Sequence, residues 1–202
     1  MARNFFDPES FAWKPFGYIA DLFMLSMLWF LCSLPVITLG ATGTALYDAV
    51  AHGFRYKEAE AISRFFRTLR KEFKLATLSL LPLGAVWAAC FLALRLFISS
   101  APPSDIAFVA AAAGLFLMLL PTGVLCWVFP LLSRFGFDWK GLLVTSVKLA
   151  FAHLPSTLVM ALSAAGAVWL CLRFIVPLLF MPALLCLFHS VFLERIFRAY
   201  MD

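Results

Sequence analysis

The chain has 202 residues, of which 64% are apolar or aromatic and only 13% are charged. A soluble domain carries about 25% charged and about 45–50% apolar residues. This composition excludes a disordered chain, a secreted disulfide scaffold and an ordinary cytosolic enzyme. It indicates an integral membrane protein.

Residues 1–16 are rich in aromatic side chains and carry Asp7 and Glu9. A cleaved signal peptide would have basic residues at these positions. We therefore expect 1–16 to form an interfacial segment. The apolar run that begins after Asp21 is expected to stay in the protein as its first membrane segment.

Residues 17–54 predict either a helical hairpin or one kinked membrane span. The first 18 residues would make about 27 Å of helix, and Pro35 then disfavours its continuation. Gly40 and Gly43 permit a tight turn, in which one of them would adopt a positive φ angle. The apolar stretch that follows is short for a full crossing.

Residues 55–74 form the clearest amphipathic segment, a basic cytoplasmic helix. An apolar stripe at helical spacing is made by Ile62, Phe65, Phe66, Leu69 and Phe73, and another side carries Arg64, Arg67, Lys71 and Lys74. We expect this helix to lie against the inner leaflet, held by anionic lipid. The alternative is a docking site for a cytoplasmic partner. Basic charge is ordinary beside a membrane, so no nucleic-acid partner is expected.

Five runs without a charged residue cover 118 of the 202 residues. About 20 apolar residues cross a bilayer core as a helix, and a helix satisfies its own backbone there. The chain therefore predicts an all-α, polytopic membrane helical bundle in a single membrane domain. Its later parts are a second hairpin at 75–133, a cytoplasmic or interfacial segment at 134–154, and a third hairpin with the C-terminal end at 155–202.

The distribution of basic residues predicts the topology, because Lys and Arg concentrate in cytoplasmic loops. A first hairpin gives six membrane helices with both termini inside. It leaves only Arg95 and Arg173 outside, against 14 basic residues inside. A single first span gives five helices, an external N-terminus and a split of 12 to 4. The six-helix model fits better, and both models place the C-terminus in the cytoplasm.

Ionisable residues within apolar runs are candidate functional residues, because they are costly in a membrane. The candidates are Asp21, Asp48, His52 and His189. Asp48 and His52 stand four residues apart and so share a helix face. We expect this pair to contact Arg55 or Lys57.

The remaining charged residues at the ends of the apolar runs are expected to have structural roles. Arg95, Arg173 and Glu194 lie at predicted helix ends, where long side chains reach water. The histidines show no metal-binding spacing, and no nucleophile elbow, P-loop or dinucleotide motif occurs. We therefore expect no catalytic residues, no cofactor and no metal.

Three stretches of the chain resemble the YesL-like family of bacterial integral membrane proteins, a domain of unknown function. They are Phe5-Phe6-Asp7-Pro8, Cys32-Ser33-Leu34-Pro35-Val36-Ile37-Thr38-Leu39-Gly40-Ala41 and Arg195-Ile196-Phe197-Arg198-Ala199-Tyr200. The resemblance implies a multi-pass protein of the bacterial cell membrane. Genes of this family often neighbour those for polysaccharide breakdown and ABC-type sugar uptake.

That setting implies a non-catalytic accessory role in carbohydrate uptake, in contact with a sugar ABC permease or a membrane sensor. The alternative is a small-solute secondary transporter or a channel-like oligomer. A transporter needs polar groups that converge at mid-membrane, whereas most charges of this sequence map to helix ends. The partner hypothesis is therefore favoured.

Overall fold

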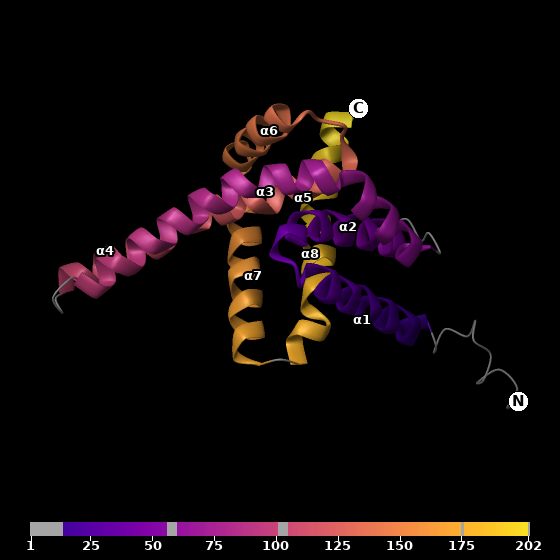
Figure 1. Cartoon of the computed structure of the whole chain (residues 1–202), viewed down its shortest axis with the longest axis horizontal. Coiled ribbons are helices and arrows are strands. Elements are labelled where there is room, and N and C mark those ends of the chain that lie inside the picture. The colour runs from indigo at the N-terminus through magenta and orange to yellow at the C-terminus, as the bar shows by residue number, and fades with distance from the viewer. Residues whose placement is uncertain (1–13, 56–59, 101–104, 175, 202) are drawn as a thin grey trace, which may run out of the picture.

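The computed structural model describes residues 14–55, 60–100, 105–174 and 176–201, and these form helices and short turns without a strand. The expected all-α class is confirmed for this part of the chain (Figure 1). The long helices are α1 (Lys14–Ser33), α2 (Leu39–Val50), α3 (Ala61–Ser100), α4 (Asp105–Leu117), α5 (Leu119–Arg134), α6 (Trp139–Ala152), α7 (Leu154–Arg173) and α8 (Met181–Met201). Shorter helical turns are η1 (Val36–Thr38), η2 (Ala51–Arg55) and η3 (Val176–Leu179).

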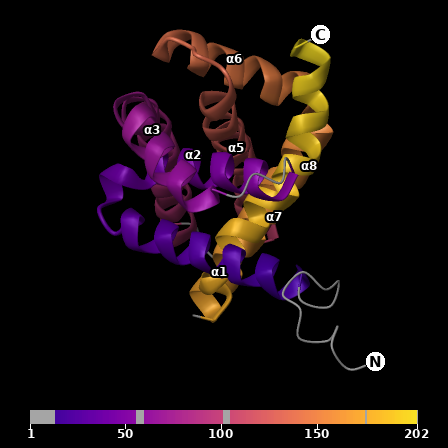
Figure 2. The same cartoon turned by 90° about the vertical axis from the view of Figure 1, so that its right-hand side faces the viewer.

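The short helix α2 forms the centre of the fold. It packs against α1, α3, α5 and α8 (Figure 2), and every residue from Gly40 to Val50 except Gly43 is buried. Many of these residues are small, which lets neighbouring backbones approach closely. A Cβ atom on Gly40 would lie 2.8 Å from the carbonyl oxygen of Ala76 in α3. At 12 residues, α2 is about 18 Å long and serves as a core helix.

The turn between α1 and α2 differs from the one predicted. It is built by Pro35 and η1, where the Thr38 amide and hydroxyl both donate to the Pro35 carbonyl, at 2.9 and 2.6 Å. Gly40 and Gly43 lie inside α2 and have no positive φ angle. The predicted left-handed glycine is therefore wrong, and Gly40 instead permits the close contact with α3.

Three helical stretches are long and apolar enough to cross a membrane in the described part of the chain. They are Ala61–Ser100, Phe108–Arg134 and Leu154–Arg173. The most apolar 18-residue stretch of α3 has a mean hydropathy of 2.0 and none of it is buried inside the protein. Figure 1 shows α3 and α4 as a long arm, with α7 and α8 running across it. The expected six membrane helices are not confirmed.

Helix α5 supplies the largest core side chain and holds α7 close. Trp127 is fully buried, and its indole N–H donates to Thr157 Oγ1 at 2.9 Å. Gly123, one turn earlier, makes room for the same threonine, because a Cβ there would lie 2.4 Å from the Thr157 methyl carbon. The Thr157 side chain thus holds α7 against α5 in two ways, with its hydroxyl bound to Trp127 and its methyl group packed on Gly123.

Candidate functional site: a buried charge network

The central polar side chain is Asp48, near the C-terminal end of α2. Asp48 is 4% exposed, and its carboxylate faces α3. Arg64 Nε donates to Oδ2 at 3.0 Å, and Thr68 Oγ1 donates to the same oxygen at 2.6 Å. Arg64 and Thr68 stand four residues apart on α3, so one face of that helix supplies both donors.

His52 continues the network where α2 widens into the π-helical turn η2. Its Nδ1 lies 3.0 Å from both the carbonyl oxygen and Oδ1 of Asp48. On the opposite side, Nε2 lies 2.9 Å from Arg64 Nη2 and 3.3 Å from Arg134 Nη1. Because guanidinium groups only donate, Nε2 must be the acceptor. This geometry fits a neutral imidazole with its proton on Nδ1.

Arg134 and Glu194 complete the network from α5 and α8. The Glu194 side chain is 0% exposed, and its Oε1 accepts from Arg134 Nη2 at 2.6 Å and Nε at 3.0 Å. The Tyr47 hydroxyl of α2 adds a longer contact to Oε1 at 3.4 Å. Arg134 is the last residue of α5, where a cation also complements the helix dipole.

These contacts define the charge network: Tyr47, Asp48, His52, Arg64, Thr68, Arg134 and Glu194. It joins α2, α3, α5 and α8 and holds two carboxylates, two guanidinium groups and one neutral imidazole, so it carries no formal net charge. Desolvation offsets much of the Coulombic attraction in such buried pairs. Removal of one partner, however, leaves an uncompensated charge and costs about 3–5 kcal/mol. The hydrogen bonds and ion pairs of the network therefore link these four helices.

The structure brings together the predicted pair Asp48 and His52 and shows two partners that were not predicted, Arg64 and Arg134. The side chain of Arg55 and the whole of Lys57 lie outside the described residues, so the expected contact with them stays a prediction. Glu194 was expected at the water boundary, and this expectation is wrong. Its buried carboxylate is stabilised by Arg134, 60 residues away in the sequence.

Asp21 and His189 stand apart from the charge network. Asp21 is exposed on α1 and lines an open cavity with Glu60 and Ser63. His189 is buried in α8, and its Nε2 lies 2.9 Å from Ser163 Oγ in α7. The serine hydroxyl donates to the Met160 carbonyl at 2.8 Å, so it accepts from the imidazole. This pair links two helices and does not form an activated nucleophile.

The basic segment of α3 is split between an inner and an outer face. Arg64 turns inward to Asp48, whereas Arg67, Lys71 and Lys74 are exposed. Arg70 lies on the same side of the helix as these three residues, although the predicted basic side did not include it. The apolar stripe is divided as well: Phe65 is fully buried, and exposed side chains are Ile62, Phe66 and Phe73. The buried face of α3 instead follows Phe65, Thr68, Ala76 and Ser79.

No three His, Cys, Asp or Glu side chains of the described residues group closely enough to hold a metal ion.

Residues 22–94 match the model of DUF624, a family described as proteins of unknown function. No curated protein and no solved structure matches the chain. The matched segment includes Asp48, His52 and Arg64, and it does not include Arg134 and Glu194. The similarity to DUF624 therefore covers the α2–α3 half of the charge network.

Proposed function

We propose that this chain is a multi-pass protein of the bacterial cell membrane that acts as a non-catalytic partner of a carbohydrate-uptake system. The observation that carries the non-catalytic part is the charge network. Its buried ionisable groups pair with one another across four helices, as expected for a scaffold that holds its shape. A scaffold of this kind offers its outer surfaces to a partner.

The exposed apolar surface of two helices supports a membrane location. Large apolar side chains are exposed along most of α3 and α7, among them Leu81, Phe91, Leu96, Leu162 and Trp169. Such extended apolar surface on a monomer marks contact with lipid or another protein. Both termini are proposed to lie in the cytoplasm, on the basis of the basic-residue distribution.

The carbohydrate part of the proposal rests on the resemblance to the YesL-like family. The match to DUF624 is compatible with that resemblance. The chain has no nucleotide-binding motif of its own. Any part in ATP-driven uptake would therefore be played through a partner that supplies the ATPase.

One observation favours a second candidate, a small-solute transporter. Buried Asp, Glu, Arg and His side chains in an apolar protein are typical of ion and substrate pathways. In that case the pairs Arg64–Asp48 and Arg134–Glu194 would have to open during transport. The two candidates differ in whether the purified protein moves a solute by itself.

The test combines growth, co-purification and transport. Deletion of the gene is expected to slow growth on an oligosaccharide and leave growth on glucose unchanged. A tagged chain, extracted in mild detergent, should recover a permease subunit, whereas an equally tagged unrelated multi-pass protein should not. Normal growth on every sugar and no recovered permease would contradict the partner role. Solute movement by the purified chain in liposomes would establish the transporter instead.

A further inference from the structure

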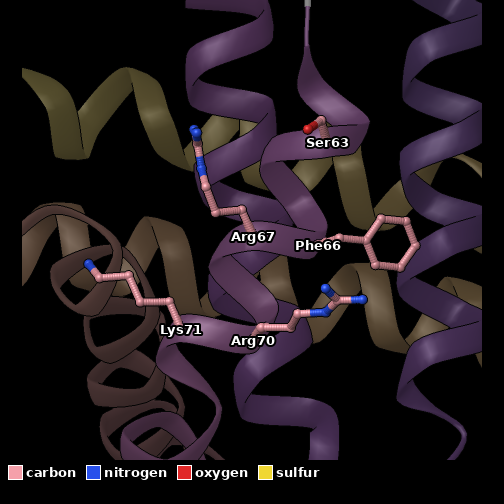
Figure 3. Close-up of a pocket in the computed structure, with 5 residues that line it drawn as sticks. All are labelled: Ser63, Phe66, Arg67, Arg70 and Lys71. Atoms are coloured by element: carbon pink, nitrogen blue, oxygen red, sulfur yellow. The ribbon is translucent and has the colours of Figure 1, made fainter.

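The outer face of α3 concentrates positive charge on one side of the helix. We define the basic face as Arg67, Arg70, Lys71 and Lys74, which follow the spacing i, i+3, i+4 and i+7 and are all exposed. Three of them line an open cavity together with Ser63 and Phe66 (Figure 3). The figure shows the basic side chains spreading outward from successive turns of the helix.

Most of this charge is uncompensated. Lys71 pairs with Glu72 at 3.0 Å, and the Lys71 side chain remains 78% exposed. Within the described residues, no carboxylate lies at ion-pair distance from Arg67, Arg70 or Lys74. Arg64 is engaged by Asp48 on the inner side, so it does not contribute. The basic face therefore presents about three free positive charges to an anion.

The location of the basic face indicates what anion it meets. Large apolar side chains are exposed along α3 from Leu78 to Ile98. Lys74 lies four residues, or about 6 Å along the helix axis, before Leu78. Arg70 lies about 12 Å before Leu78, a distance that a long side chain shortens by bending toward the interface. Phe73 is exposed between them, and interfacial helices bury such apolar side chains at the boundary of headgroups and acyl chains. Cations at this level of an apolar helix meet lipid headgroups.

We propose that the basic face is a binding site for the phosphate of an anionic phospholipid headgroup. Arg67 and Arg70 can each donate two parallel hydrogen bonds to phosphate oxygens, and Lys71 and Lys74 supply point charges. The acyl chains would then run along the exposed apolar side chains that begin at Leu78. The inference rests on the membrane location of α3 and is independent of the role in carbohydrate uptake.

The test measures lipid binding by the purified full-length chain in neutral detergent micelles. A fluorescent phosphatidylglycerol is titrated in, and its anisotropy is followed. The triple variant Arg67→Gln, Arg70→Gln, Lys74→Gln is expected to bind about a hundredfold more weakly, because each charge at an anionic interface contributes roughly a fivefold effect. The matched control removes three other exposed charges: Arg95→Gln, Arg195→Gln and Arg198→Gln. It is expected to bind like the native chain.

Competition separates the possible sources of the phosphate. Unlabelled phosphatidylglycerol should displace the probe, whereas phosphatidylcholine and inorganic phosphate at equal concentrations should not. Displacement by inorganic phosphate would overturn the lipid assignment in favour of a free-anion site. Equal weakening in both triple variants would overturn it in favour of general charge attraction. The double variant Arg67→Lys, Arg70→Lys keeps the charge, so its weaker binding with an unchanged melting temperature would identify the guanidinium geometry as the determinant.

Discussion

The pair Arg134–Glu194 allows the strongest test of the charge network. In Glu194→Gln, an amide replaces the carboxylate that accepts two hydrogen bonds from Arg134, so a buried guanidinium loses its counter-charge. Loss of one partner of a buried pair costs about 3–5 kcal/mol. The Arg134 side chain is 15% exposed and can turn partly toward water. We therefore expect the lower end, about 3 kcal/mol, and a similar loss for Arg134→Met.

The double variant Arg134→Met, Glu194→Leu should be much more stable than the sum of the single changes predicts, because apolar replacement of both partners removes the unpaired charge. The assay is reversible unfolding in mixed micelles, analysed as a double-mutant cycle that includes Glu194→Leu alone. The pair Lys71–Glu72, in which the lysine side chain is 78% exposed, is the control, with an expected coupling of about 0.5 kcal/mol or less. Additive effects of the Arg134 and Glu194 substitutions would refute the assignment of a coupled buried pair.

Three further predictions follow from the central helix and the topology. His52→Gln keeps a hydrogen-bond acceptor near the two guanidinium groups, whereas His52→Lys adds a third cation. The lysine variant should therefore unfold at a clearly lower temperature than the glutamine variant. Equal melting temperatures of the two variants would contradict the neutral imidazole. Gly40→Ala should cost about 1–3 kcal/mol because its Cβ would press on α3, whereas Gly43→Ala has ordinary contacts and should be neutral in the same unfolding assay. Ser10→Cys, in a chain without the five native cysteines, should escape an impermeant thiol reagent in intact cells; labelling from outside would contradict the cytoplasmic N-terminus.

Much of the helical organisation could be predicted from the sequence, because charge-free runs of about 20 residues allow few other structures. The break at Pro35 separates α1 from α2, and Pro155 lies in the first turn of α7. The buried position of α2 could not be predicted in the same way. Hydropathy does not distinguish a helix surrounded by lipid from one surrounded by other helices, since both are apolar. Its many small residues were the available signal.

The candidate site was partly predictable for a similar reason. The spacing of Asp48 and His52 indicates a shared helix face, and the structure places them within 3.0 Å of each other. Their partners come from other helices, so no local pattern points to them. Arg134 and Glu194 each follow a charge-free run, and for Glu194 that position suggested contact with water. Arg64 belongs to the basic segment of α3, and the sequence pattern of this segment does not show that Arg64 turns inward. Packing against α2 buries the face of the helix that holds Phe65.

The charge network also explains how a helix made of small residues keeps its position. Gly40 and the small Ala and Thr side chains allow close packing, and the fit of Gly40 against Ala76 already disfavours a slip of α2 by one turn along α3. The same slip would move Asp48 by about 5 Å and break contacts that are now 2.6 and 3.0 Å long. It would leave a buried carboxylate without its donors, which costs several kcal/mol. The small residues therefore allow the helices to approach closely, and Gly40 and the charges together determine the register.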